Sequence, residues 1–262
     1  MDRRLPASSA STDGSGRVDV GRAVRCIFRQ EGWGHTLLMG TLFMFIPAVG
    51  PIALQGYAIR IFKHLVVTGD DRNLPPLAGF GELLHLGIVS FLMSMLYMFP
   101  IFFLVYTGIG LGVLAGVLVV AGGAAALAAL GLDPGLTAAL TAVLAVLVVI
   151  AVLLVVYAFT IAIAYPLQAV HTMVEITGKI EYAWKVREVL AYIRFLGPEY
   201  RRAFVGMFFS NLLIMMAGTL LCYFGIFPAA VVVSLAAAHM RAQLYRIYLA
   251  RGGTPLPMDP RF

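Results

Sequence analysis

The residues that could do chemistry in this sequence are few, and none forms a complete catalytic pattern. Glu82 with His85 and His171 with Glu175 each place a carboxylate and an imidazole about one helical turn apart, which is part of the arrangement that holds metal ions in helical bundles. We expect the two pairs near opposite membrane surfaces, so we predict no metal site. The phosphate-loop, dinucleotide-binding, Gly-x-Ser-x-Gly, Cys-x-x-Cys and His-Glu-x-x-His patterns are absent. We therefore predict no catalytic residue and no cofactor.

The last apolar segment carries a polar stripe near its end. His239, Gln243 and Arg246 are separated by four and three positions, so they share one face of a helix. Because guanidinium groups suit phosphate geometry, this stripe is a candidate contact for a lipid phosphate or a substrate. The alternative is that its arginines only extend toward the membrane surface.

The first apolar segment is interrupted by prolines. Pro47 and Pro51 remove backbone hydrogen bonds, and Gly56 lets Tyr57 and Arg60 approach the interface. Broken helices line binding sites in many transporters, although they also occur as plain kinks. The two segments together give these candidate contacts for a ligand or lipid: Gln55, Tyr57, Arg60, His239, Gln243 and Arg246.

The composition identifies the environment of these residues. Of the 262 residues, 61% are hydrophobic and 12% are charged, whereas about a quarter of a soluble domain is charged. Disorder is excluded as well, because a disordered chain combines low hydrophobicity with high charge. We expect the net charge of +6 to be concentrated on the cytoplasmic side of the membrane, where anionic lipid head groups attract basic residues. We therefore predict membrane lipids as partners and no nucleic acid.

Long blocks without charge predict the membrane helices. About 20 apolar residues cross a hydrocarbon core about 30 Å thick, so the sequence predicts an all-α polytopic membrane bundle of six transmembrane helices. We place these spans at 34–58, 83–105, 108–131, 136–165, 203–222 and 226–248, with a turn at Tyr106-Thr107-Gly108 between the second and third.

Two amphipathic helices, at 18–31 and 180–196, are predicted to lie on the membrane surface. They are either a collar that binds acidic lipid or a partner, or plain connectors. We expect residues 18–250 to form a single membrane domain between a disordered cytoplasmic tail, 1–17, and a second cytoplasmic tail, 251–262.

The distribution of Lys and Arg predicts the orientation, because cytoplasmic loops carry the excess. With the N-terminus inside, the inner segments hold all of the Lys and Arg except Arg60, Lys63 and Arg72. Both termini are then cytoplasmic. If the first segment is instead re-entrant, Arg60 returns to the cytoplasm and the number of crossings becomes odd.

Small residues four positions apart mark a candidate packing face. Gly108, Gly112 and Gly116 form such a ladder, and helices in lipid associate through close backbone approach at small residues. The ladder is expected to pack either on another helix of the same chain or across a homo-oligomer.

A set of short motifs carries a resemblance to a known family. It comprises Gly56-Tyr57, Arg60, Gly69-Asp70, Leu74-Pro75, Gly87 and Tyr97 ahead of Pro100, with His239, Gln243 and Tyr245 in the last helix. Over most of residues 30–250 the chain resembles the bacterial and archaeal membrane proteins grouped as domain of unknown function 4013. The resemblance implies a bacterial or archaeal inner membrane. It supplies no activity, so no catalytic residue is carried over.

Three functions are compatible with these observations. The leading hypothesis is a non-enzymatic integral membrane protein, a component or accessory of a membrane assembly or transport process, with a homo-oligomer or a membrane complex as partner. The second is a permease or lipid transporter, with its site between the broken first helix and the last helix. The third is an intramembrane enzyme built from scattered residues. A continuous cavity reaching Gln55 and His239 would favour transport, whereas a solid bundle would favour assembly.

Overall fold

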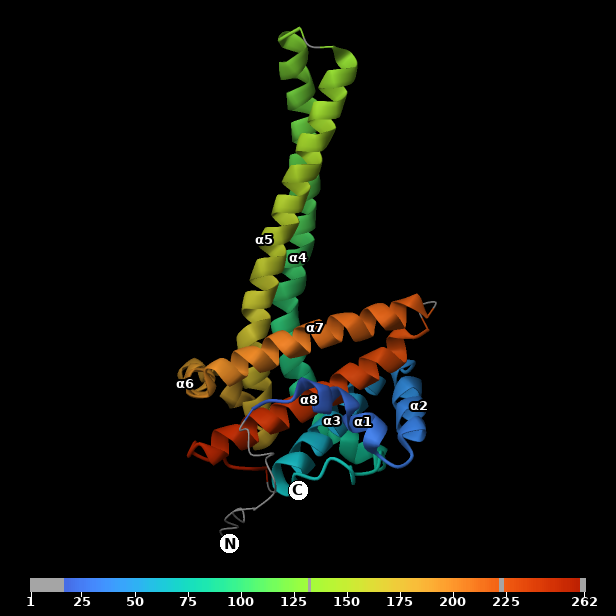
Figure 1. The fold of residues 1–262 in the computed structure, drawn as a ribbon, viewed down its shortest axis with the longest axis vertical. Coiled ribbons are helices and arrows are strands. Elements are labelled where there is room, and N and C mark those ends of the chain that lie inside the picture. The colour runs from blue at the N-terminus through green and yellow to red at the C-terminus, as the bar shows by residue number, and fades with distance from the viewer. Residues whose placement is uncertain (1–16, 132, 222–223, 260–262) are drawn as a thin grey trace. The chain divides into compact units, whose positions relative to one another are not determined.

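The computed structural model of the protein describes residues 17–131, 133–221 and 224–259 (Figure 1). Its elements are the helices α1 (Val20–Arg29), α2 (Trp33–Met44), α3 (Val49–Thr68), α4 (Phe80–Ala129) and α5 (Pro134–Thr177), the 3-10 helix η1 (Ile180–Trp184), and the helices α6 (Val186–Leu196), α7 (Pro198–Leu220) and α8 (Ile226–Ala250). No strand occurs in the described ranges. The all-α prediction is therefore confirmed. The predicted disordered tail lies, up to residue 16, outside the described residues.

The chain divides into two compact units. Unit 1 comprises Met1–Met93 with Gln168–Phe262, and unit 2 comprises Ser94–Leu167. Four helices are long and apolar enough to span a membrane, namely α4, α5, α7 and α8. The prediction of a multi-pass membrane protein is supported, but the predicted number of six spans is not confirmed.

The first predicted span, 34–58, is two helices rather than one. The chain breaks between Met44 and Val49, and Ala48 at the break has a positive φ of 62°. Beyond α3, the carboxylate of Asp71 lies 2.8 Å from Nε of Arg22 in α1. The two residues flank the predicted span, so their contact brings together the chain before and after 34–58, as the re-entrant alternative requires. A single crossing at 34–58 is therefore not confirmed.

The reason lies in what surrounds α3. Its side chains Ala53, Tyr57, Ala58, Ile61 and Phe62 are fully buried inside unit 1. An apolar run of about 20 residues predicts a membrane crossing by length, but a helix buried on all sides by protein has the same composition. Composition alone does not distinguish the two.

The turn predicted at Tyr106-Thr107-Gly108 is also wrong, because α4 runs without interruption through these residues. Within unit 2, α4 and α5 form an antiparallel hairpin (Figure 1), and Gly108 lies directly against the side chain of Val156 in α5. The glycine thus provides room for the neighbouring helix instead of a turn. Asp133 begins α5 by accepting a hydrogen bond of 2.8 Å from the Gly135 amide, and Pro134 takes the first helical position, where its missing donor costs nothing.

Unit 1 is built around α8, which contacts α1, α2, α3, α6 and α7. The helix expected at 18–31 is present as α1, and its apolar face, with Ala23, Cys26 and Ile27, is buried. The segment expected at 180–196 is present as η1 and α6, and α6 buries Val189 and Leu196. The protein itself thus covers these amphipathic faces in part, while Phe28 of α1 and Val186 and Leu190 of α6 stay exposed.

Candidate functional site

Two helices of unit 1 cross at a pair of glycines. A Cβ atom at Gly56 of α3 would collide with the carbonyl of Leu83 in α4, and one at Gly87 of α4 would collide with the carbonyl of Ile52 in α3. Only glycine permits this backbone approach. Beside the crossing, Gln55 of α3 donates a hydrogen bond of 3.0 Å from its Nε2 to Ser90 Oγ of α4.

A buried carboxylate joins four helices beside this crossing. Glu175 of α5 is fully buried and binds Arg241 of α8 through two contacts, Nε to Oε2 at 3.0 Å and Nη2 to Oε1 at 3.1 Å. Its Oε1 also accepts hydrogen bonds from Gln55 Nε2 at 3.0 Å and from Ser90 Oγ at 3.4 Å. His171 Nδ1 lies 3.5 Å from the same oxygen. We call Gln55, Ser90, His171, Glu175 and Arg241 the Glu175 cluster.

The electrostatics of the Glu175 cluster are balanced. The carboxylate and the guanidinium compensate each other, and two-point geometry makes this type of pair strong. Removing one partner from a buried pair costs far more than the pair contributes, because a bare charge is left behind. The cluster therefore fixes α3, α4, α5 and α8 in a single mutual arrangement within unit 1.

A second polar cluster lies where α1 and the loop after α3 meet α8. Asp71 accepts hydrogen bonds from Arg22 at 2.8 Å and from Arg29 at 3.3 Å, and His239 Nε2 lies 4.0 Å away. Burial raises the pKa of the Asp71 carboxyl, but the hydrogen bond and charge of Arg22 outweigh burial, so its pKa lies below the ordinary value. Asp71 thus remains an anion at neutral pH.

The structure places the predicted contact residues at three separate points. Gln55 belongs to the Glu175 cluster, and Arg60 binds Glu82 at 2.8 Å. Tyr57 donates a hydrogen bond to the carbonyl of Pro75 at 3.1 Å. All three therefore contact other parts of the same chain.

The polar stripe of α8 is covered by the N-terminal part of the chain and the loop after α3. Gln243 Oε1 accepts a hydrogen bond of 2.8 Å from the backbone amide of Asp19, and Gln243 Nε2 donates one of 3.0 Å to the Asp19 carbonyl. The same Nε2 lies 3.0 Å from Nδ1 of His239. The guanidinium of Arg246 lies against Gly69. These stripe residues thus contact other parts of the chain, while Gln243 and Arg246 stay partly exposed.

The glycine ladder of unit 2 faces valines of α5. Gly108 meets Val156, and ideal Cβ atoms at Gly112 and Gly116 would lie 3.4 Å from Val152 and 3.3 Å from Val149. The ladder therefore packs within the hairpin.

Sequence reasoning missed the pairing of Glu175 with Arg241. It also placed Glu82 and His85 far from His171 and Glu175, whereas His85 and Glu175 line the same pocket. A signal was present, because Glu175 and Arg241 are the first charged residues after the charge-free runs 134–174 and 203–240. Within the described part of the chain, no group of three or more His, Cys, Asp or Glu residues is arranged to hold a metal ion.

The fold and its apolar helices define a class, the all-helical multi-pass membrane proteins. A family model described as Protein of unknown function (DUF4013) matches residues 39–223, which is most of the chain. The chain belongs to this family, and the resemblance is confirmed over residues 39–223, whereas His239, Gln243 and Tyr245 lie beyond the matched residues. No curated protein and no solved structure matches the chain. Gly56 and Gly87, which contributed to the resemblance, are the residues of the α3–α4 crossing.

Proposed function

We propose that the protein is a non-enzymatic integral membrane protein that serves as a component or accessory of a membrane assembly. The observation that carries this proposal is the internal pairing of polar groups in unit 1, as in the bond of Gln55 to Glu175 and that of Gln243 to Asp19. Groups that are hydrogen-bonded within the chain support a structural role. The exposed side chains of unit 2, such as Leu111 and Leu118, are apolar and suited to fatty acyl chains.

The membrane we infer is the cytoplasmic membrane of a bacterium or archaeon, crossed by α4, α5, α7 and α8. The two loops that would face outward, 130–133 and 221–225, contain no Lys or Arg. None of the 19 Lys and Arg residues then lies in an outward loop, a stronger bias than the six-span arrangement gives, and both termini are cytoplasmic. The positive-inside rule supports this orientation, and anionic lipids are the partners that it implies.

A test of the assembly role uses a photo-crosslinking amino acid at single positions of α4 in native membranes. Leu118 is 62% exposed, whereas Gly112 faces Val152 of the same hairpin. We expect a crosslinker at position 118 to give one protein adduct of defined mass. Native mass spectrometry of the complex should give the same ratio of this protein to its partner. The matched crosslinker at position 112 should give only an internal link. Adducts with lipid alone at every exposed position of α4, α5 and α7 would contradict the assembly role.

Transport is the second candidate, favoured by one observation. A buried Glu175–Arg241 pair joins two helices that are candidate membrane spans, and ionisable residues at such places often mark transport pathways. Proteoliposomes containing the intact protein test this alternative. If the pair serves transport, a solute flux should appear that Glu175→Gln with Arg241→Gln abolishes while the fold is retained.

A further inference from the structure

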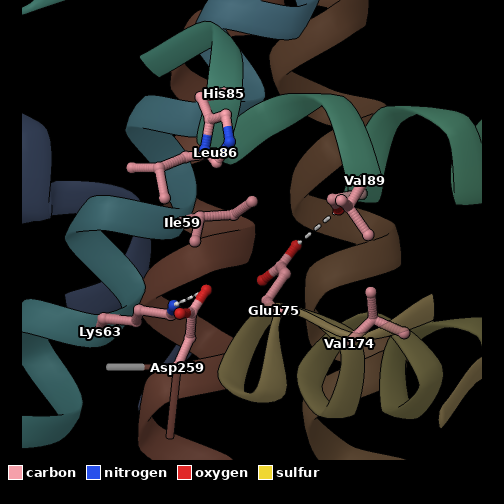
Figure 2. Close-up of a pocket in the computed structure, with 10 residues that line it drawn as sticks. Ile59, Lys63, His85, Leu86, Val89, Val174, Glu175 and Asp259 are labelled. Atoms are coloured by element: carbon pink, nitrogen blue, oxygen red, sulfur yellow. Dashed lines mark hydrogen bonds and ion pairs between the residues drawn. The ribbon is translucent and has the colours of Figure 1, made fainter. Parts of the chain in front are cut away.

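A small pocket lies between α3, α4 and α5 of unit 1, next to the Glu175 cluster. Figure 2 shows Lys63, Glu175 and Asp259 around it, with His85 at its opposite end. Its free volume is about 10 Å³, on the order of what a single water needs. The pocket is therefore nearly filled by the chain's own side chains.

The pocket contains a buried lysine. Only 3% of the Lys63 side chain is exposed, and a buried ammonium group needs an anionic partner. Asp259 supplies a carboxylate 3.9 Å from Lys63 Nζ, and its own side chain is 5% exposed. Glu175, the other acid at the pocket, has both of its oxygens engaged by Arg241.

The carboxylate of Asp259 comes from a segment without regular secondary structure. We call residues 252–259, which follow α8, the strap. Its hydrogen bonds to the rest of unit 1 include the Asp259 amide with the Ile176 carbonyl at 3.0 Å and the Leu256 amide with the Tyr245 hydroxyl at 2.9 Å. Thr254, Pro255 and Pro257 of the strap are exposed, and an irregular segment with exposed residues opens locally more easily than a helical core. The strap can therefore leave while the helices that form the pocket stay in place.

We propose that this pocket is a binding site for an anionic oxygen group, a carboxylate or a phosphate, which Asp259 occupies as an internal competitor. When the strap leaves, the space of the Asp259 side chain opens beside Lys63, and the lysine loses a carboxylate partner. An external anion then provides the same charge and the same acceptor oxygens. The inference stands apart from the proposed assembly role, because it requires only the lysine, the pocket and the strap.

The test uses the intact protein in lipid nanodiscs, with Asp259→Asn to weaken the docked strap. A spin label at Thr254→Cys, an exposed strap position, in a background without other cysteines reports release of the strap. The probes are inorganic phosphate, acetate, and vesicles of phosphatidylglycerol against phosphatidylcholine. If the strap is docked in about nine molecules of ten, its release raises the apparent affinity about tenfold. We expect this gain with Asp259→Asn and an unchanged affinity with Asp70→Asn, which alters an aspartate of the loop after α3.

The double variant Lys63→Met with Asp259→Asn removes both charges together, so that neither is left bare in the core, and it should not bind the probes. Binding of inorganic phosphate or acetate would assign the site to small anions, and binding only of phosphatidylglycerol vesicles would assign it to a lipid headgroup. The proposal is overturned if Asp259→Asn mobilises the strap yet binds no probe more tightly than the unaltered protein. It is equally overturned if the double variant binds as well as Asp259→Asn.

Discussion

Unit 1 and unit 2 are both helical, but their side chains meet different surroundings. In unit 1, Phe62 and Ala58 are fully buried by neighbouring helices, and charged residues such as Glu175 are paired inside. In unit 2, Phe103 is 67% and Leu118 is 62% exposed, and Asp133 is its one charged residue. An apolar segment can thus be covered by its own chain or left for lipid, and the partners of its few polar residues distinguish the two cases.

The largest effect is expected from removing one partner of the buried ion pair in unit 1. Glu175→Gln leaves the Arg241 guanidinium without its counter-charge, so the free energy of unfolding should fall by about 3–5 kcal/mol. The control is Glu82→Gln, which breaks the Glu82–Arg60 pair of 2.8 Å where the Glu82 side chain is 77% exposed. An exposed pair contributes about 1 kcal/mol or less. Thermal unfolding in nanodiscs measures both.

The double variant Glu175→Gln with Arg241→Gln completes this cycle. It removes both charges, so it should recover part of the stability lost in Glu175→Gln, giving a clear coupling energy. Equal losses from Glu175→Gln and Glu82→Gln would show that the Glu175 cluster is not buried as described.

The second effect concerns the helix crossing in unit 1. Gly56→Ala places a Cβ against the Leu83 carbonyl, and because backbone cannot move aside cheaply, the loss should be on the order of 3 kcal/mol. Gly81→Ala in α4 is the matched control, since a Cβ there meets nothing within 4 Å. The control should unfold at the same temperature as the unaltered protein or above it. A tolerated Gly56→Ala would disprove the close approach of α3 and α4.

A smaller effect is expected from the same kind of change in unit 2. Gly108→Leu drives a side chain into Val156, whereas a Cβ at Gly110 meets nothing within 4 Å. A side chain can adjust where backbone cannot, so we expect a loss of about 1–2 kcal/mol for Gly108→Leu and little change for Gly110→Leu. The measurement is resistance to unfolding in detergent. The reverse order would mean that the ladder does not face α5.

A pH dependence is expected from Asp71 in unit 1. The pKa of Asp71 is lowered in the folded protein, since Arg22 outweighs the effect of burial. Its contribution to stability is therefore complete above the ordinary pKa of about 3.9 and is lost as the pH falls through the lower folded value. Protease cleavage near α1 should rise below about pH 4, and Asp71→Asn should abolish this dependence. An unchanged dependence in Asp71→Asn would assign the acid response to other groups.

The smallest expected effect is that the Cys26 thiol of the folded protein does not react with a thiol reagent. Burial raises the pKa of the Cys26 thiol to about 12, so at neutral pH it is a protonated thiol shielded by unit 1. With Cys222→Ser as background, N-ethylmaleimide should label the protein only after denaturation. Labelling of the native protein would place the apolar face of α1 in contact with solvent or lipid instead of α8.

The sequence predicted the helical class because long apolar runs without charge leave few alternatives. It did not predict where those runs meet lipid. The run 34–58 has the length and composition of a span, but its identity depends on contacts with residues far along the chain, such as Arg22 with Asp71. Gly108 has the residue type of a turn, yet Val156 of α5 determines its role.

The candidate site was predictable only in part. Gln55 was identified as a polar residue in an apolar segment, and it lies in the Glu175 cluster. Its partner Glu175 is 120 positions away and Arg241 a further 66. No local pattern encodes contacts over such separations, because they depend on which helices pack together. The opposite charges that end two long apolar runs were the available clue.

The most direct test of the membrane arrangement is cysteine labelling from each side of the membrane, at Asn73→Cys after α3 and Leu130→Cys after α4, in a background without other cysteines. Both positions are exposed. The four-span arrangement, in which the chain before and after 34–58 faces the cytoplasm, predicts that a membrane-impermeant maleimide reaches position 73 only from the cytoplasm and position 130 only from outside. Labelling of position 73 from outside would restore a crossing at 34–58 and contradict the contact between Arg22 and Asp71.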